Sequence, residues 1–562
     1  MNLVRARLRP MIRVEAIVLV VTAWLIATVN GGWWSAVGAG RIWSDPSNWL
    51  FIIAVFVALV ALHFVLLGAL ANRWTVRPLL TAIIVASAAT AYFMRTYAVM
   101  MDPTMIQNIL KTDAHEAREL MSWSMVGSVL LWSALPVAFV WWVRIEHRPW
   151  LRSFFLRVGY MAGALVVGVL SVLLVSRDLT SLMRNQRELR YLITPGNYIY
   201  GLVGNLARGA RDARAPREPI GTDARLIRVA TAPHKPRVFV LVLGETVRAA
   251  NFSLLGTYAR PTTPELAKLD VVAFRNVSSC GTSTEVSVPC MFSQWGREDY
   301  DERRIRNSEG LLNVLARAGY VVKWLDNQSG CKGVCQGEGI EYQKIDPQEA
   351  GGGGAADLCA GDECLDGILV RRLQSELARV REDSVIVLHM MGNHGPAYFR
   401  RYPPEFRRFT PDCATAELRN CSREQVVNAY DNAILYADHV LAGIVGTLAS
   451  APALDTAMIY VSDHGESLGE NGLYLHGLPY SIAPSTQTHV PMIAWLSPGF
   501  SAAEGVNRRC LQAKAGDPLS HDNLFHSVLG LLDVHTSVYK TERDFFDDCR
   551  SRSGVAFAQN GR

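Results

Sequence analysis

The apolar residues of this chain are concentrated near its N-terminus, and this uneven distribution constrains the fold more than any other feature. Five apolar stretches, at about residues 12–29, 49–70, 78–97, 123–143 and 154–175, are each long enough to cross a lipid bilayer as a helix. The first stretch lacks a small-residue cleavage site, so we expect it to remain as an anchor. The sequence therefore predicts a five-helix transmembrane domain over residues 1–176.

The loops between these stretches differ in basic residues, which predicts the orientation of the chain. Arginines are frequent before the first stretch and in the second and fourth loops: Arg5, Arg7, Arg9, Arg13, Arg73, Arg77, Arg144, Arg148 and Arg152. The first and third loops carry few basic residues for their length, chiefly Arg41, Arg95, Lys111 and Arg118. Because basic loops stay in the cytoplasm, the N-terminus is expected there, and an odd number of spans places everything after residue 175 outside.

All ten cysteines lie in that external part: Cys280, Cys290, Cys331, Cys335, Cys359, Cys364, Cys413, Cys421, Cys510 and Cys549. An even number of cysteines outside the membrane indicates disulfides in an oxidising compartment. Eight form four couples of close neighbours and leave Cys510 with Cys549, although the residues alone leave the pairing open. The alternative is a zinc site at the couples 331/335 and 359/364. It is disfavoured because thiolate zinc sites suit reducing compartments and six cysteines would stay unexplained.

The external part divides into a bridging region and a globular domain. Residues 177–204 carry arginines beside tyrosines and are expected along the membrane surface, whereas residues 205–236 are rich in Arg, Ala and Pro, as is typical of a linker. From residue 237 to 562, short apolar runs at 238–243, 321–325, 385–388, 458–461 and 491–496 alternate with helical stretches. This pattern predicts an α/β domain with a parallel sheet covered by helices on both faces, and a glycine loop at 351–354.

The net charge of +5 is small for 562 residues, and no basic stripe with interleaved aromatic residues is present. Nucleic acid is therefore not an expected partner.

Polar side chains follow several of the predicted strands directly. One strand ends in Gly244-Glu245-Thr246, another in Asp463-His464-Gly465-Glu466, and others lead to His394 and to Asp326-Asn327-Gln328-Ser329. A single acid after a strand usually caps a helix or lies in a loop. Because the carboxyl ends of parallel strands form one edge of a sheet, however, four such endings predict a common site. Glu245, Asp463 and His464 supply oxygen and nitrogen donors that suit zinc.

The candidate nucleophile is Thr284, in the turn-rich segment CGTSTEVSVPC between Cys280 and Cys290. Taken alone, this threonine would more often be a helix cap. A hydroxyl at a helix N-terminus, however, lies in positive potential beside free N–H groups that can bind phosphate oxygens. Metal coordination would activate it, and a disulfide between Cys280 and Cys290 would hold it rigidly.

Several segments make the chain resemble a known family. GETVRAANFSLLGTY, CGTSTEVSVPCMFS, NHGPAY, SDHGESLGENGLYLHGLPY and RYLITPGNYIY are similar to motifs of the phosphoethanolamine transferases that modify lipid A, a family that includes the mobile colistin-resistance enzymes. The resemblance covers essentially the whole chain. It implies an alkaline-phosphatase-like α/β catalytic domain in the periplasm, with a mixed, mostly parallel sheet between helices, carried by a multi-pass inner-membrane protein.

The resemblance also implies roles for individual residues. Glu245, Thr284, Asp463 and His464 match zinc ligands, with Thr284 carrying the phosphoethanolamine. His394 and His476 match histidines that handle the phosphate or a second zinc. Gln328, Ser329 and Lys332 match residues that line the substrate pocket, with Glu298 as a further contact; Gln328 departs from the asparagine of the family.

The implied reaction has two halves. Thr284 takes phosphoethanolamine from phosphatidylethanolamine, and a phosphate of lipid A in lipopolysaccharide then receives it, which confers polymyxin resistance. The expected protein is a monomer with one tight zinc site.

Three alternatives can be distinguished by residues. A glycerol-phosphate polymerase of the lipoteichoic acid type also has five spans, but the ten external cysteines argue against it. A sulfatase would carry Cys or Ser at the nucleophile position. A decayed, non-catalytic module should have lost at least one of Glu245, Thr284, Asp463 and His464, yet all four are present.

Overall fold

The computed structural model describes residues 9–112, 114–212, 217–226, 235–346, 358–360 and 363–551. The chain forms two compact units: unit 1 contains Met1–Lys111 and Met121–Gly209, and unit 2 contains Thr112–Leu120 and Ala210–Arg562. The predicted glycine loop at 351–354 and parts of the predicted linker, 213–216 and 227–234, lie outside the described residues.

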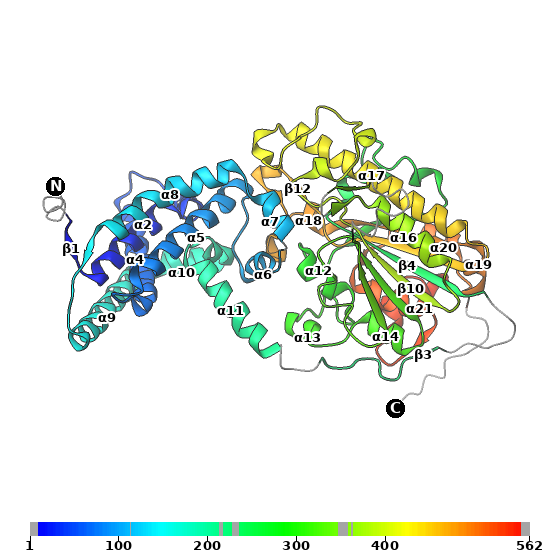
Figure 1. Ribbon diagram of the computed structural model, residues 1–562, viewed down its shortest axis with the longest axis horizontal. Helices are drawn as coiled ribbons and strands as arrows, with labels where there is room; N and C mark the ends of the chain where they lie inside the picture. The colour runs from blue at the N-terminus through cyan, green and yellow to red at the C-terminus, as the bar shows by residue number, and fades with distance from the viewer. Residues whose placement is uncertain are drawn as a thin grey trace. The chain divides into compact units, whose positions relative to one another are not determined.

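Unit 1 is helical, and the five predicted spans are all helices. They are α2 (Val14–Thr28), α4 (Pro46–Leu70), α5 (Val76–Tyr97), α8 (Trp123–Trp142) and α9 (Trp150–Leu174) (Figure 1). α4, α5, α8 and α9 are long and apolar enough to span a bilayer, whereas the shorter α2 passes this test only together with α3 (Gly31–Gly38), after a bend of 60°. The prediction of a five-helix apolar domain is confirmed.

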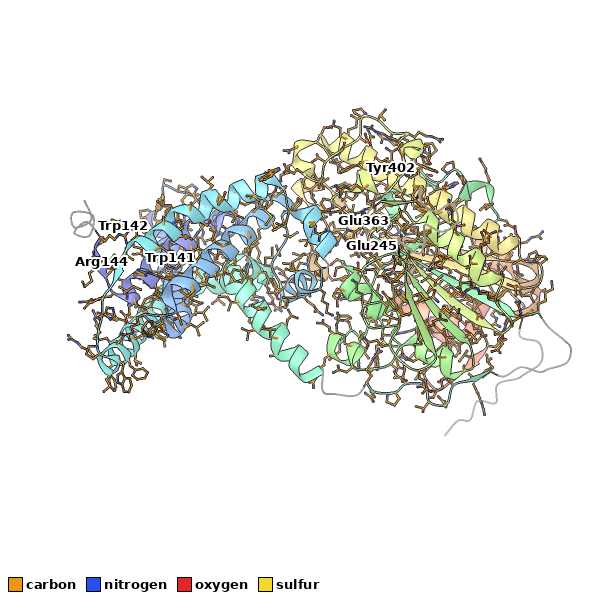
Figure 2. All side chains as sticks on the ribbon, viewed as in Figure 1. Trp141, Trp142, Arg144, Glu245, Glu363 and Tyr402 are labelled. Carbon is orange, nitrogen blue, oxygen red and sulfur yellow. A yellow bond between two sulfur atoms is a disulfide. The ribbon has the colours of Figure 1, made fainter. Side chains whose placement is uncertain are left out.

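The outer surfaces of these helices suit a lipid environment. α9 has no buried residue, and large apolar side chains of α8 and α9, such as Leu131 and Leu174, are exposed. Figure 2 labels Trp141, Trp142 and Arg144 at the end of α8, where aromatic and basic residues are typical of a membrane–water interface. Unit 1 is therefore the membrane unit of a multi-pass protein.

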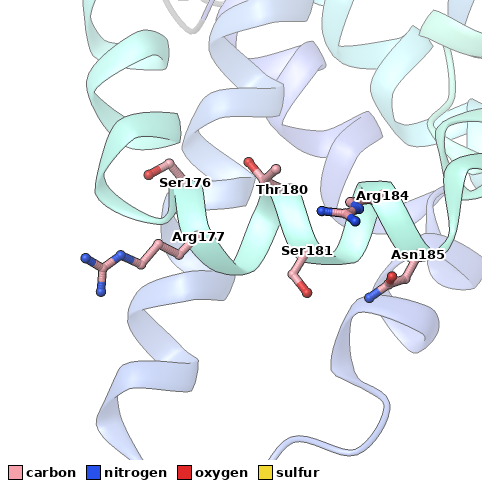
Figure 3. A pocket seen from close by; sticks show the side chains of 6 residues that line it. All are labelled: Ser176, Arg177, Thr180, Ser181, Arg184 and Asn185. Carbon is pink, nitrogen blue, oxygen red and sulfur yellow. The ribbon is translucent and has the colours of Figure 1, made fainter.

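The segment after the fifth span begins with the amphipathic helix α10 (Ser176–Asn185). Its apolar residues Leu179, Leu182 and Met183 pack against a buried cluster that includes Trp33 and Phe51. The opposite face lines a shallow pocket with Ser176, Arg177, Thr180, Ser181, Arg184 and Asn185 (Figure 3). A helix with one apolar and one basic face is typical of a membrane surface.

A short 3-10 helix, η1 (Arg187–Leu192), connects α10 to α11 (Gly196–Asp212). The backbone N–H of Gly196, at the start of α11, donates to Nε2 of His63 in α4 at 3.1 Å. The segment that follows the spans is thereby attached to them.

Unit 2 is built on an eight-stranded sheet with the order β15-β5-β14-β11-β4-β10-β6-β7. The strands are β4 (Arg237–Gly244), β5 (Val272–Ser278), β6 (Val321–Asp326), β7 (Ile340–Lys344), β10 (Ser384–His389), β11 (Asp455–Ser462), β14 (His489–Leu496) and β15 (Leu519–Ser520). Neighbouring strands are parallel except where β14 pairs with β11 and β5. The five predicted runs are all strands, and the mixed, mostly parallel sheet is confirmed.

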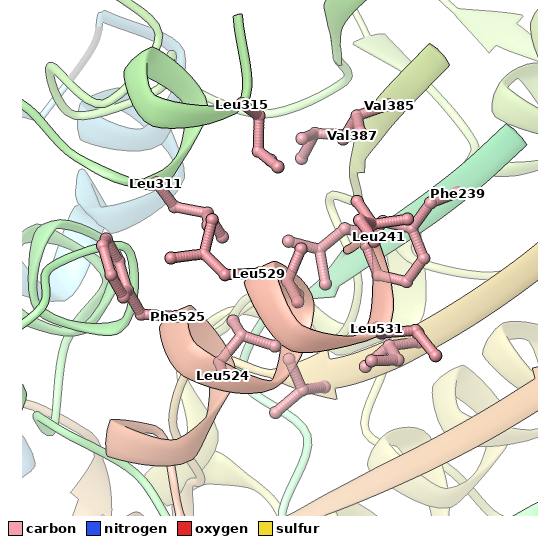
Figure 4. Close-up of a cluster of buried hydrophobic side chains, with 14 of the residues drawn as sticks. Phe239, Leu241, Leu311, Leu315, Val385, Val387, Leu524, Phe525, Leu529 and Leu531 are labelled. Carbon is pink, nitrogen blue, oxygen red and sulfur yellow. The ribbon is translucent and has the colours of Figure 1, made fainter. Parts of the chain in front are cut away.

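The sheet is covered on both faces, as its apolar strands require. In β4, Phe239, Leu241 and Leu243 face a core built with α14 (Leu311–Arg317) and α21 (Asp522–Leu531) (Figure 4). The alternate residues Val238 and Val240 face a second core.

The second core is formed by α16 (Gly367–Leu377) and α17 (Arg423–Ala449). α17 is long and apolar enough to cross a membrane. A capping box of Ser422 and Gln425 begins it, however, and its apolar residues pack inside unit 2, so it is a core helix.

Five disulfides join all ten cysteines: 280–290, 331–335, 359–364, 413–421 and 510–549. The predicted disulfide framework is confirmed, including the pairing of the distant Cys510 and Cys549. The alternative zinc site at Cys331, Cys335, Cys359 and Cys364 is excluded because disulfides bond these four cysteines to one another.

Candidate metal centre

Two neighbouring parallel strands place three donor side chains together. The register of β4 and β11 pairs Gly244 with Ser462, so Glu245 and Asp463 emerge side by side at the carboxyl edge of the sheet. His464 follows directly, and donor atoms of Glu245, Asp463 and His464 all lie within 4.8 Å of one another. All three residues are fully buried (Glu245 is labelled in Figure 2).

The turn after β4 holds these carboxylates in place. Thr246 has a φ of +61°, which is unusual for a β-branched residue. Its backbone N–H donates to Asp463 Oδ1 at 3.0 Å, and its hydroxyl donates to Glu245 Oε1 at 2.6 Å. The Tyr430 hydroxyl donates to the Thr246 carbonyl at 2.6 Å. Strained backbone of this kind persists only where several contacts fix it, as they do here.

Close backbone packing supports Glu245 from the other side. Gly392 has a φ of +54°, and a Cβ added there would lie 2.6 Å from the Glu245 carbonyl oxygen. The next residue, Asn393, donates its N–H to the same carbonyl at 3.0 Å. Only glycine allows the loop after β10 to approach this closely.

Thr284 joins the three donors from a separate segment. Its hydroxyl lies 3.0 and 3.2 Å from the two carboxylate oxygens of Glu245 and 3.4 Å from His464 Nε2. Thr284 is the first residue of α12 (Thr284–Met291), and Ser283 occupies the N-cap position. The helix-cap reading of Thr284 is therefore wrong: its hydroxyl points to the donor cluster from the N-terminus of a helix, where the potential is positive.

The nucleophile segment is fixed by covalent and polar contacts. The disulfide between Cys280 and Cys290 spans α12 and the turn before it. The N–H of Cys280 donates to Nδ1 of the buried His521 at 3.0 Å, and His521 Nε2 donates to the Ser462 carbonyl at 3.0 Å. His521 thus connects the nucleophile segment to the end of β11.

The donor set fits a divalent cation such as zinc. Asp463 Oδ2 is buried and accepts no hydrogen bond from the described part of the chain, although it lies 3.4 Å from His464 Nε2. Burial and the charge of Glu245 raise the pKa of Asp463 to about 6. Burial opposes protonation of His464, but the charges of Asp463 and Glu245 raise its pKa to about 10. The rise for His464, and part of the rise for Asp463, come from two buried carboxylates whose negative charge a cation would neutralise.

His394 and His476 lie beside the donor cluster. The rings of His464 and His476 are 4.3 Å apart between centroids, and those of His394 and His476 are 6.0 Å apart. His476 Nδ1 lies 3.3 Å from Glu466 Oε2, and Glu466 is fully buried. Burial raises the pKa of Glu466 to about 8, so this carboxyl holds its proton at neutral pH.

The predicted substrate-binding residues divide into two groups. Gln328 reaches the centre, since its Nε2 donates to Glu245 Oε2 at 3.2 Å. The Ser329 hydroxyl donates to Gln328 Oε1 at 2.6 Å, and Lys332 Nζ donates to the Ser329 hydroxyl at 2.7 Å. Glu298 does not join them. Its carboxylate pairs with Arg543 at 2.6 Å, and its side chain is 77% exposed.

Sequence reasoning missed three residues that build the site: Thr246, Glu466 and His521. Thr246 and Glu466 stand next to predicted ligands in the motifs GET and DHGE, which was the available signal. Nothing in the sequence pointed to His521, because its contacts join segments that are distant along the chain.

Two family models match the chain. Residues 237–534 match the model described as Sulfatase, and residues 59–209 match the one described as Phosphoethanolamine transferase EptA/EptB.

Individual relatives match nearly the whole chain. It is 39% identical to phosphoethanolamine transferase EptA of Salmonella typhimurium, over 90% of this chain and 92% of that protein. It is 36% identical to phosphatidylethanolamine transferase Mcr-1 of Escherichia coli, over 93% and 96% respectively. Among solved structures, the integral membrane lipooligosaccharide phosphoethanolamine transferase A of Neisseria meningitidis aligns with a TM-score of 0.88 at 35% identity, covering 96% of this chain and all of that one.

Proposed function

The chain belongs to the phosphoethanolamine transferase family, and we propose that it moves phosphoethanolamine from phosphatidylethanolamine to a phosphate of lipid A. The donor is supported by the name of the relative Mcr-1, a phosphatidylethanolamine transferase. The acceptor is supported by a relative at 28% identity, named Kdo(2)-lipid A phosphoethanolamine 7''-transferase. An added ethanolammonium group would reduce the negative charge of lipid A and so weaken the binding of cationic polymyxins.

The position of the Thr284 hydroxyl carries this proposal. It lies 3.0 Å from a carboxylate oxygen of Glu245, next to His464 and at the start of α12. A hydroxyl among metal-type donors, with helix N–H groups beside it, is suited to attack phosphorus. Thr284 is therefore the proposed nucleophile and carrier.

We propose that zinc is the cofactor, held by Glu245, Asp463, His464 and Thr284. When bound, zinc would lower the pKa of the threonine hydroxyl and stabilise negative charge on the phosphate. The region of His394 and His476 is the proposed place for a second ion.

In the first half-reaction, the Thr284 oxygen forms a bond to phosphorus, and the bond from phosphorus to the diacylglycerol oxygen breaks. Glu245 accepts the hydroxyl hydrogen bond and so favours loss of the proton. One of the imidazoles, His394 or His476, takes up the proton that Thr284 loses and delivers it to the departing diacylglycerol oxygen.

In the second half-reaction, an oxygen of the lipid A phosphate forms a bond to the phosphorus of the phosphothreonine, and the bond from phosphorus to Thr284 Oγ breaks. The released Oγ takes up the proton that the attacking phosphate gives to the imidazole, so that Thr284 is regenerated. The N–H groups at the start of α12 and the ammonium of Lys332 stabilise the phosphate oxygens during both transfers.

The proposed location is the inner membrane, with unit 2 in the periplasm. The protein is proposed to be a monomer. The proposed domains are residues 1–176 for the spans, 177–236 for the bridge and 237–562 for catalysis. The five disulfides of unit 2 and the arginine-rich loops at Arg73 and Arg144 support this placement. Donor and acceptor lipids both lie in a membrane, which explains why the catalytic unit is anchored to one.

Substitution of Thr284 tests the proposed function. Intact-mass measurement after incubation with phosphatidylethanolamine should detect a phosphoethanolamine adduct on the wild-type protein and none on Thr284→Ala. Thr282→Ala is the matched control, because the Thr282 hydroxyl donates to the Leu478 carbonyl instead of contacting the cluster. Full transfer to lipid A by folded Thr284→Ala would contradict the assignment.

A further inference from the structure

A short segment of unit 2 comes from between two helices of unit 1. Thr112–Leu120 belongs to unit 2 by its contacts, whereas the chain before and after it belongs to unit 1. The segment contains α7 (Ala114–Leu120) and lies in sequence between the spans α5 and α8. A function for this segment must therefore be sought in unit 2.

Glu119 of this segment forms ion pairs with two arginines, and one of these pairs is buried. Its Oε2 lies 2.5 Å from Arg401 Nη2, and its Oε1 lies 3.3 Å from Arg400 Nη1. The Glu119 side chain is 2% exposed and the Arg401 side chain 4%, whereas that of Arg400 is 52% exposed. The pair with Arg401 is thus the one removed from water.

Arg401 transmits this contact to the active site. Its Nε donates to the backbone carbonyl of His394 at 2.9 Å, and its Nη1 lies 3.3 Å from Glu363 Oε1. The planar guanidinium uses all three nitrogens, on Glu119, Glu363 and His394, so its orientation is fixed. A shift of Arg401 would remove this hydrogen bond from the backbone that carries the His394 imidazole.

The position of Glu119 has no explanation within α7 itself. It lies in the last turn, where the helix dipole disfavours a negative charge. Burial of a carboxylate is also costly unless a partner compensates it. The contact with Arg401 accounts for both features.

We propose that Glu119 is a positioning residue, which holds Arg401 and thereby sets the His394 loop for transfer. This inference rests on the proposed function, in which His394 serves the reaction. It implies that a segment carried between two membrane helices contributes to the catalytic unit, so that His394 is best placed in a chain that contains Thr112–Leu120.

The test compares Glu119→Gln with Arg400→Gln in full-length enzyme reconstituted with phosphatidylethanolamine and lipid A. Glu119→Gln should lower kcat by about 10- to 100-fold while KM for phosphatidylethanolamine stays within about twofold, because misplacement of a catalytic group affects turnover. Arg400→Gln should stay within about threefold of wild type, since the Arg400 side chain is 52% exposed and its ion pair with Glu119 is open to water.

A double variant tests whether Glu119 acts through Arg401. If it does, Glu119→Gln combined with Arg401→Gln should be no slower than Arg401→Gln alone. Additive losses would overturn the proposal. So would a rise in KM with kcat unchanged, or equal losses in Glu119→Gln and Arg400→Gln.

Hydrogen–deuterium exchange provides a measurement that does not depend on activity. Glu119→Gln should speed exchange of amides around His394 and leave α17 protected, which would show that the fold persists. Unchanged exchange around His394 would overturn the inference even if the variant were inactive. Failure of the wild-type protein to form the Thr284 adduct would instead count against the proposed function.

Discussion

Single side chains in the centre depend strongly on one another's charge. Glu245, Asp463 and His464 are all excluded from water, and two of them are acids. Burial works to raise the pKa of Glu245, but the hydrogen bond and charge of His464 hold it well below its ordinary value. A bound cation would take the place of the proton on His464 and bind the carboxylates directly, since zinc requires a neutral imidazole and ionised carboxylates.

Metal binding should therefore stabilise unit 2. Zinc added to chelator-treated protein should raise the unfolding temperature by several degrees, because free metal at 1,000 times its Kd contributes about 4 kcal/mol. Glu245→Gln should abolish the shift. Glu265→Gln should retain it, because Glu265 pairs with His439 at the surface. Thermal unfolding with and without zinc checks this, and an equal shift in Glu245→Gln would exclude Glu245 as a ligand.

A second prediction at this scale concerns Asp438, which lies away from the centre. Its carboxylate accepts the backbone N–H groups of Glu265 and Leu266 at 2.8 and 2.9 Å, and burial raises its pKa from 3.8 to about 6. The folded protein therefore holds the proton more tightly than the unfolded chain. The resulting stability is fully present below about pH 4 and is lost as pH rises to about 6, by up to about 3 kcal/mol.

Asp438→Asn should remove this slope. Urea unfolding of both proteins between about pH 4 and pH 7 should show wild type losing stability relative to the variant. Asp412→Asn is the control for this pH dependence. Burial works to raise its pKa, but Arg407 and Tyr402 hold the pKa below its ordinary value, so its contribution is lost only at lower pH. A flat difference between wild type and Asp438→Asn would contradict the prediction.

At the scale of elements, the parallel strands explain why much of the site could be predicted. Glu245 and Asp463 follow the adjacent strands β4 and β11, and their pairing is a consequence of register. The antiparallel direction of β14 could not be predicted, since an apolar run has the same composition in either direction. Nor could the exclusion of Glu298 from the centre, because its partner Arg543 is 245 residues away in sequence.

Among the five disulfides, the Cys280–Cys290 bond is expected to matter most for catalysis. Its two cysteines are 10 positions apart in sequence and enclose Thr284, whereas Cys510 and Cys549 are 39 positions apart. Chain entropy predicts that loss of either bond costs about 2–4 kcal/mol, with the longer loop costing more.

Replacing Cys280 and Cys290 by serine should therefore lower kcat by about tenfold or more, because Thr284 loses its rigid support. Replacing Cys510 and Cys549 should reduce stability at least as much and leave kcat within about threefold. Denaturant midpoints and transfer rates at a temperature where both variants are folded would separate the two effects. Equal losses of kcat would show that the 280–290 bond serves stability alone.

On the scale of the whole molecule, one chain joins unit 1, whose helices suit a lipid environment, to the globular, disulfide-bonded unit 2. Composition alone does not separate them completely. α17 is long and apolar enough for a span but lies in unit 2, and Thr112–Leu120 belongs to unit 2 although both its neighbours in sequence belong to unit 1. Packing and capping explain the first case. The second includes the ion pair of Glu119 with Arg401, which no pattern in the sequence indicates.

The orientation of the spans can be tested because all ten cysteines are paired, so that an introduced cysteine is the reactive one. Ser44 and His147 are both exposed, in the first and fourth loops of unit 1. A membrane-impermeant maleimide should label Ser44→Cys in intact spheroplasts. It should label His147→Cys only after permeabilisation, because the arginines around His147 favour the cytoplasm.

The labelling order also tests whether unit 2 lies in a compartment that permits the proposed reaction. If His147→Cys were labelled first, unit 2 would face the cytoplasm, where its five disulfides would be reduced and Thr284 would lose the Cys280–Cys290 support. The donor and acceptor lipids would then have to be reached from the opposite leaflet. The predicted labelling order instead places the Thr284 hydroxyl, the disulfides and the outer leaflet in one compartment, which is the condition for transfer between two lipids.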